Sequence, residues 1–132
     1  MSNNKQSVSP RIRVIQKLYG NSLNSEAEIE FPKSQYKKFI KDVVMGTIER
    51  NDLIEETISK YLAEDLDLKR TDKLLKIIIF AGIFELMFKH NSPTKVIISE
   101  YVKTSESFLE KAQIKFVNAI LDKISKNIRK SH

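Results

Sequence analysis

The sequence of 132 residues contains no cysteine and no tryptophan, and it has only three glycines and three prolines. Without cysteine the chain can form neither disulfides nor thiolate metal sites, and it has no cysteine nucleophile. Gly20, Gly46 and Gly82 are isolated from one another, so the chain has no glycine-rich loop of the type that binds nucleotide phosphates. These absences exclude several common classes of enzyme and of metalloprotein.

Long apolar segments and a secretory signal are also missing. The longest uncharged apolar run extends from Ile77 to Phe84, which is far shorter than the roughly 20 residues that a membrane-spanning helix needs. The first ten residues are polar and lack the apolar stretch of a signal peptide. We therefore expect a cytoplasmic protein with no transmembrane segment.

Histidine is rare as well, because His90 stands at an expected helix end and His132 is the last residue. Neither has another histidine or an aspartate at metal-ligand spacing, so we expect no metal site, no cofactor and no catalytic residue. The acidic cluster of Glu64, Asp65 and Asp67 is interpreted as a solvated loop that caps a helix. The chain is predicted to bind rather than to catalyse.

Positive charge is what the sequence has in excess, with 23 Lys and Arg against 17 Asp and Glu, or +6. Residues 1–20 hold four cations and no acid, and residues 109–132 hold six cations and two acids. Each end therefore carries a charge of about +4, and such surfaces favour acidic partners such as nucleic acid. If the two ends meet in the fold, they form one basic surface.

Apolar residues recur at helical spacing in six segments. The segments are Pro10 to about Leu23, residues 36–48, residues 53–62, Lys73 to His90, residues 97–108, and Lys111 to about Arg129. Pro10, Pro32 and Pro93 each stand where a helix is expected to begin, because proline suits the first helical position. With short loops and no internal repeat, the pattern predicts an all-α fold, a compact bundle of six or seven helices.

The segment from Lys73 to His90 differs from the others because apolar residues surround its helix axis. Such a helix lies in the centre of a bundle or meets a partner. The β-branched run of Ile77, Ile78 and Ile79 also suits a strand, but the chain offers no second strand to pair with it. We therefore predict a central or partner-binding helix.

Four motifs resemble those of a known family. They are QKLY at 16–19, FEL at 84–86, SPTKVIISEYV at 92–102 and KFVNAILDK at 115–123. Their order and spacing are similar to those of the NusB family over most of the chain, and the last motif is the most specific. The resemblance implies a fold of two perpendicular three-helix bundles, here a single RNA-binding domain of residues 9–132 after a flexible arm of residues 1–8.

The resemblance also implies a function. Proteins of the NusB family bind the boxA element of nascent ribosomal RNA together with NusE, a ribosomal small-subunit protein, in the RNA polymerase antitermination complex. We therefore expect a transcription antitermination factor that binds boxA-type single-stranded RNA and NusE, as a monomer or a homodimer. The family typically has an arginine-rich amino terminus, whereas this chain offers only Lys5, Arg11 and Arg13 there.

Charge and the resemblance together predict the RNA-binding residues. The set comprises Lys5, Arg11, Arg13, Lys17, Lys76, Lys111, Lys115, Phe116 and Asn118. On the last expected helix, Lys126 and Arg129 share the face of Lys111, Lys115 and Asn118, and Phe116 borders it. Phosphate contacts supply affinity, and an aromatic ring that stacks on an unpaired base adds ~1–3 kcal/mol.

Each of these predictions has an alternative. The basic face of the last helix would also suit plain solvation, and Phe116 would also suit the core. Lys76 is a charge on an otherwise apolar helix, and it would reach solvent at the edge of the bundle if it does not contact a ligand.

Five residues are predicted to contact a protein partner. The resemblance places Tyr19 and Glu85 at the contact with the ribosomal protein. Phe80, Ile83 and Met87 lie on one side of their helix and form either an exposed patch for that partner or part of the core. For Glu85 the alternative is a buried carboxylate paired with a local lysine.

Two other functions stay open at the level of sequence. A helical module that binds only proteins, as a homodimer or an adapter, would explain the apolar residues around the segment from Lys73 to His90. Its basic ends would then serve only solubility. NusB-like domains also precede the catalytic domain of some ribosomal RNA methyltransferases, but this chain ends before such a domain, so we expect no enzymatic activity.

Overall fold

The computed structural model describes residues 9–129, and the predictions for residues 1–8, namely a flexible arm and an RNA contact at Lys5, lie outside that range. Within it there are six helices and no strand. The helices are α1 (Pro10–Leu23), α2 (Lys37–Glu49), α3 (Asn51–Tyr61), α4 (Lys73–Phe88), α5 (Thr94–Ser105) and α6 (Lys111–Ile128). The predicted all-α fold is confirmed. None of these six helices combines the length and the hydrophobicity required to cross a bilayer.

Two of the three prolines mark helix starts as expected. Pro10 is the first residue of α1, and Pro93 directly precedes the first residue of α5. The prediction at Pro32 was wrong, because α2 begins only at Lys37. Phe31 packs against the core just before this proline, and the chain then forms a turn in which the Lys37 N–H donates to the Ser34 carbonyl. The anchored side chain and the turn delay the helix.

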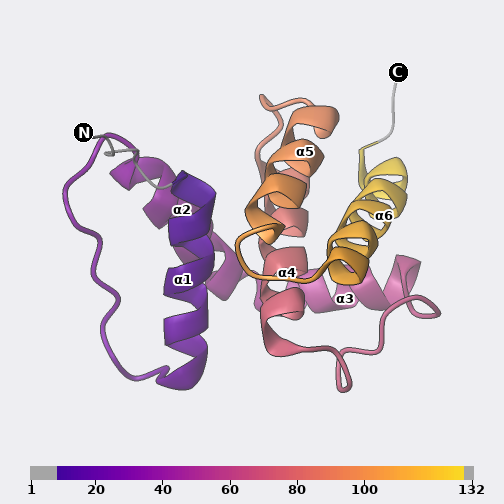
Figure 1. Cartoon of the computed structure of the whole chain (residues 1–132), viewed down its shortest axis with the longest axis horizontal. Helices are drawn as coiled ribbons and strands as arrows, with labels where there is room; N and C mark the ends of the chain where they lie inside the picture. The colour runs from indigo at the N-terminus through magenta and orange to yellow at the C-terminus, as the bar shows by residue number, and fades with distance from the viewer. Residues whose placement is uncertain (1–8, 130–132) are drawn as a thin grey trace.

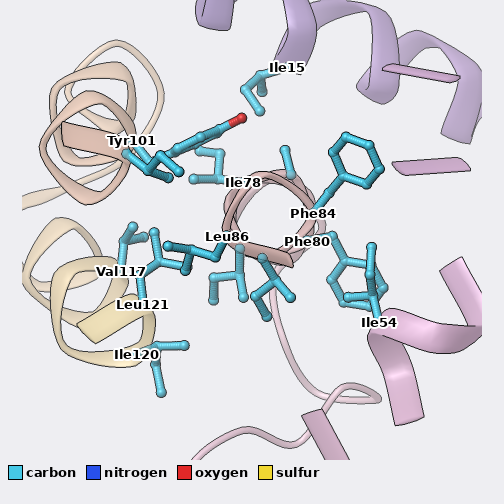
Figure 2. Close-up of a cluster of buried hydrophobic side chains, with 14 of the residues drawn as sticks. Ile15, Ile54, Ile78, Phe80, Phe84, Leu86, Tyr101, Val117, Ile120 and Leu121 are labelled. Carbon is cyan, nitrogen blue, oxygen red and sulfur yellow. The ribbon is translucent and has the colours of Figure 1, made fainter. Parts of the chain in front are cut away.

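Helix α4 lies at the centre of the molecule and packs against each of the other five helices (Figure 1). Figure 2 looks along α4 and shows its side chains pointing in different directions, with Leu86 toward α6 and Phe80 toward Ile54 of α3. Burial on all sides explains why this segment is apolar around its whole circumference. The prediction of a helix, and not of a strand, is confirmed, and of the two predicted roles, central or partner-binding, the packing of α4 supports the central one.

Two glycines allow other helices to approach α4 closely. A Cβ atom at Gly46 of α2 would overlap the ring of Phe84, and one at Gly82 of α4 would lie 2.9 Å from a methyl carbon of Leu121 in α6. A larger residue at either position would force the neighbouring side chain or helix to move. Helices α1 and α2 thus pack on one side of α4, and α5 and α6 pack on the other (Figure 1).

The two basic helices at the ends of the described range, α1 and α6, do not meet. Helices α1 and α6 make no contact with each other, and α4 and α5 lie between them (Figure 1). The expectation of one basic surface formed by these helices was therefore wrong. The reason is that α4 is apolar on all sides and needs cover from several directions. Helices α1 and α6 provide that cover from different sides.

Candidate nucleic-acid interface

Arg11, predicted as an RNA contact, belongs instead to a buried ion pair. Its Nε and Nη2 atoms donate to the two carboxylate oxygens of Glu85 at 2.9 and 2.7 Å. The Glu85 side chain is 0% exposed and the Arg11 side chain is 13% exposed. The Tyr101 hydroxyl also donates to Glu85. Glu100 lies 3.7 Å from the guanidinium, which in turn lies over the ring of Phe39.

This cluster joins three helices, because Arg11 is in α1, Glu85 in α4 and Tyr101 in α5. Burial alone would lower the pKa of Arg11, but the hydrogen bond and the negative charge of Glu85 outweigh it and the pKa is raised. Burial, together with the negative charge of Glu85, raises the pKa of Tyr101 well above its ordinary value of 10.0. The cluster is therefore a charged, structural contact inside the protein.

The predicted role of Glu85 as a partner contact does not fit this burial, because the carboxylate is enclosed by its own chain. The alternative of a buried carboxylate was closer, but its partner is Arg11, 74 positions away in sequence, and not a local lysine. Periodicity places a residue on a helix face, but it does not say which distant cation will meet that face. Only the packing of α1 against α4 brings the pair together.

The patch predicted on α4 is also mostly buried. Phe80 is 4% exposed and Ile83 is 0% exposed, so both belong to the core and offer no surface to a partner. Met87 is partly buried and packs against the same core. Tyr19, at 37% exposed on α1, is the most accessible of the predicted partner-binding residues. The other helices use this side of α4 for packing.

Arg129 leaves the predicted basic face of α6 and closes the end of α4. Its guanidinium donates to the backbone carbonyl oxygens of Leu86, Lys89 and Ser92 at 2.7, 2.7 and 2.6 Å. The last carbonyls of a helix have no partner within the helix and lie at the negative end of its dipole, so a cation stabilises them. Arg129 therefore attaches the end of α6 to the turn between α4 and α5.

The lysines of α6 fall into two groups. Lys123 and Lys126 lie 2.7 and 3.1 Å from the carboxylates of Asp65 and Asp122, respectively. Lys111 and Lys115 are exposed, and within residues 9–129 neither has a carboxylate at ion-pair distance. These two cations are the part of the predicted face that is available to an anion.

Phe116 directly follows Lys115, five positions after Lys111, and is partly buried. Its ring packs against the core, yet part of the residue stays accessible, while Asn118 is exposed. The first turn of α6 is held by a capping box, in which Glu110 accepts from a backbone N–H and Gln113 reaches back to the Glu110 N–H. The start of α6 thus presents cations and an anchored aromatic ring on a rigid turn.

Arg13 and Lys17 lie four residues apart on α1, and in the described range neither has an ion-pair partner. Lys76 is partly buried on α4, with its Nζ atom 5.6 Å from the centroid of the Phe80 ring. It lines a cavity of about 240 Å³ between α1, α2, α3 and α4, where the buried hydroxyl of Thr47 has no hydrogen-bond partner. The predicted RNA-binding residues are therefore distributed over three places.

Glu64, Asp65 and Asp67 in the loop after α3 are exposed, as predicted, but the residue that caps the next helix is Asp72 and not a member of this cluster. The Asp67 side chain accepts from the backbone N–H of Lys69, and Asp72 caps the first turn of α4 by accepting from the Leu75 N–H. In residues 9–129 no three histidine or acidic side chains are grouped in a way that could hold a metal ion.

Comparison with known proteins extends over almost the whole chain. The model of the NusB family matches residues 4–126. A curated relative from Novosphingobium aromaticivorans, named transcription antitermination protein NusB, is 33% identical over 122 residues, which cover 92% of this chain and 82% of the relative. A protein of the same name from Nitrobacter hamburgensis is 34% identical over 107 residues, with 81% of this chain and 67% of the relative covered.

Other similarities are shorter or more distant. A NusB relative from Mesorhizobium japonicum is 36% identical over 92 residues, and the match spans 59% of that protein, less than two thirds of its length. The solved structure of T. maritima NusB superimposes with a TM-score of 0.76 over 92% of each chain, at 24% identity, and so shares the fold. These curated relatives share the name transcription antitermination protein NusB. Given a family model that matches 123 consecutive positions (4–126) and relatives above 30% identity, this chain belongs to the NusB family, as its motifs indicated.

Proposed function

We propose that this protein acts in transcription antitermination by binding boxA-type single-stranded RNA in nascent ribosomal RNA leaders, together with the ribosomal protein NusE. Family membership and the name shared by the curated relatives support the process. The observation that carries RNA binding is the start of α6, where the exposed Lys111 and Lys115 have no acidic partner within residues 9–129 and where Phe116, on the same helix, keeps part of its side chain accessible.

The chemistry of this surface suits a single strand. Lysine ammonium groups bind phosphates and release counterions, which gives affinity that falls as salt rises. The accessible part of Phe116 offers a stacking surface for an unpaired base, and the exposed amide of Asn118 both donates and accepts hydrogen bonds. NusE would then take a separate surface, for which Tyr19 on α1 is the exposed candidate.

The alternative of a module that binds only proteins had rested on the apolar residues around α4. Ten of its sixteen residues are buried by the other helices of the chain. They supply no surface for a homodimer or an adapter, so the RNA-binding proposal is the one that we retain.

The test is a fluorescence anisotropy titration of labelled boxA-type RNA, with and without NusE, over a series of salt concentrations. We expect binding that weakens as the salt concentration rises. The logarithm of the binding constant, plotted against the logarithm of the salt concentration, should have a slope of about −0.7 for each phosphate contact on a single strand. The variant Lys111→Gln/Lys115→Gln should make the slope shallower by about 1.4, which is twice that value. If RNA binding is absent, or does not change with salt, both in the presence and in the absence of NusE, the proposal is contradicted.

A matched control removes the same charge elsewhere. Lys60 on α3 and Lys69 in the loop after it are exposed and lie outside the start of α6. The variant Lys60→Gln/Lys69→Gln should therefore keep the slope of the original protein. Equal losses in the two double variants would show that only the total charge matters, and not the surface on α6.

A further inference from the structure

A second basic surface lies between α1, α2 and the segment that connects them. Arg13 and Lys17 of α1, Lys33 of the connecting segment and Lys37 of α2 line one cleft of about 170 Å³. Among residues 9–129, no acidic residue lines this cleft. Within residues 9–129 none of the four cations forms an ion pair. Lys33 and Lys37 were not among the predicted RNA-binding residues.

The floor of this cleft is fixed by apolar packing. Ile40 is 5% exposed, and Phe31 packs against the core. The Nζ atom of Lys17 lies 5.8 Å from the centroid of the Phe31 ring, within cation–π distance. The turn that leads into α2 is closed by the hydrogen bond from the Lys37 N–H to the Ser34 carbonyl, at 3.3 Å. Cations from three segments are thus directed to one place by the buried residues beneath them.

The size of the cleft limits what it can hold. Sites for whole small molecules usually measure roughly 300–1,000 Å³, so a cleft of about 170 Å³ suits a single charged group more than a complete ligand. Like charges placed this close repel one another, and an anion relieves that repulsion. Arginine and lysine are the side chains that proteins use to bind phosphate.

The surroundings favour one side of α1. Arg13 and Lys17 also border a neighbouring groove, whose other wall carries Glu28 and Glu30. A polyanion is repelled by these carboxylates and attracted by Lys33 and Lys37. A polyanion would therefore reach Arg13 and Lys17 from the side of α2, where no acidic residue among residues 9–129 lines the cleft.

We propose that the cleft between α1 and α2 binds backbone phosphate of the same single-stranded RNA, as a second contact separate from α6. This inference rests on the proposed function, because it takes the bound polyanion to be RNA. It explains how the two basic ends can both serve one ligand although α1 and α6 do not touch. The strand contacts two separate surfaces and not one continuous surface.

The experiment compares two double variants of α2 and the segment before it. Lys33→Gln/Lys37→Gln removes two charges from the cleft, and Lys38→Gln/Lys41→Gln removes two exposed charges that do not line it. Labelled boxA-type RNA is titrated at several salt concentrations. The cleft variant should make the salt slope shallower by about 1.4, at 0.7 for each lost contact, whereas the matched variant should keep the slope of the original protein.

The outcomes separate this inference from the proposed function. Suppose that the original protein binds RNA, and that the salt slopes of the two double variants are either unchanged or made shallower by the same amount. The cleft is then not a phosphate contact, and this inference fails while the proposed function stands. If the original protein does not bind RNA at all, the proposed function fails and the inference fails with it. Inorganic phosphate and poly-glutamate are added as competitors. Selective loss of poly-glutamate binding in the cleft variant, with RNA binding unchanged, would assign the cleft to an acidic protein and overturn the inference.

Discussion

The amino-terminal and carboxy-terminal helices lie on different sides of α4, yet each directs one arginine inward and leaves other cations outside. On α1, Arg11 binds the buried carboxylate of Glu85, while Arg13 stays exposed. On α6, Arg129 binds backbone carbonyls at the end of α4, while Lys111 stays exposed. The two ends differ in what the arginine meets, which is a full negative charge in one case and neutral carbonyls in the other.

The net charge of a terminal segment, counted from its sequence, is therefore larger than the charge that is available to a ligand, because some of its cations bind groups of their own protein. A guanidinium has five donors in a fixed plane and remains charged when it is partly buried, so it can bind several acceptors of its own protein. A lysine ammonium is compact and strongly hydrated and more often stays in water. The lysines and Arg13, more than Arg11 and Arg129, therefore remain for RNA. The three predictions below test this division.

The largest effect is expected from Arg11→Met, which leaves the buried Glu85 carboxylate without its cation. We expect the free energy of unfolding to fall by about 3–5 kcal/mol, as measured by urea denaturation. In the triple variant Arg11→Met/Glu85→Leu/Tyr101→Phe most of this loss should be recovered, because apolar side chains can replace a buried ion pair at little cost and no buried hydroxyl is left without its acceptor.

Arg13→Met is the matched control on the same helix. Its side chain is exposed, so the stability should stay within about 0.5 kcal/mol of the original protein. RNA affinity should fall instead. Two outcomes would contradict the assignment of Arg11 to the buried ion pair and of Arg13 to RNA binding. One is an equal loss of stability in both variants, and the other is a loss of RNA binding in Arg11→Met alone while that variant stays folded.

A smaller effect is expected from Tyr101→Phe, which removes the hydroxyl that donates to Glu85. At neutral pH the loss of a hydrogen bond to a charged group should cost about 1.5–3 kcal/mol. The variant also tests the raised pKa of Tyr101, for which the ordinary value is 10.0. Above that pH the unfolded chain loses the phenolic proton and the folded chain keeps it, so the stability supplied by this group falls as pH rises.

The measurement is the free energy of unfolding as a function of pH. Below pH 10.0 the contribution of Tyr101 should be constant, and above it the original protein should lose stability more steeply than Tyr101→Phe. Identical slopes for the two proteins in the alkaline range would mean that the hydroxyl does not remain protonated in the fold.

The smallest effect is expected from Arg129→Ala at the other end. Its acceptors are neutral carbonyls at a partly exposed site, so water can replace the guanidinium and the cost should be about 1 kcal/mol. Arg129→Lys should be nearly as destabilising, because one ammonium cannot reach all three carbonyls. Lys126→Ala, on the exposed side of α6, should change stability by less than about 0.5 kcal/mol.

For Arg129 the outcome that contradicts the comparison is a loss of RNA affinity larger than the loss of stability. Such a result would mean that Arg129 contacts RNA, together with Lys111 and Lys115, as the helical spacing predicted. A full retention of stability in Arg129→Lys would likewise show that charge alone, and not the geometry of three hydrogen bonds, holds the end of α6 in place.

Much of the fold was predictable because helical periodicity is a local property. The limits of α1 matched the predicted segment from Pro10 to Leu23, and α4 and α6 ended within two residues of the predicted limits. The apolar pattern from residue 36 located α2 to within one residue, whereas Pro32 was a misleading start signal, because Phe31 packs against the core before the chain turns into the helix. Local sequence does not record where a side chain will find its tertiary partner.

Less of the candidate site was predictable. The exposed cations of α6 beside Phe116 could be placed from spacing, since they lie on the face opposite the apolar stripe. The cleft with Lys33 and Lys37 was missed although residues 31–41 contain no acid. That run of basic residues was the available signal. It indicates a binding cleft only when α1 lies alongside α2 and adds Arg13 and Lys17 to the same cleft.

The amino-acid sequence was sufficient to predict the six helices found in residues 9–129, the apolar centre formed by α4, the surplus of positive charge at the ends and the family to which the motifs belong. Each of these follows from residues that are neighbours along the chain or along one helix. Only the tertiary structure decided that Arg11 meets Glu85, that Arg129 closes α4, and that α1 and α6 lie apart. Burial of a helix that is apolar all round requires cover from several sides, and this requirement separates the two basic ends and selects which of their cations remain free.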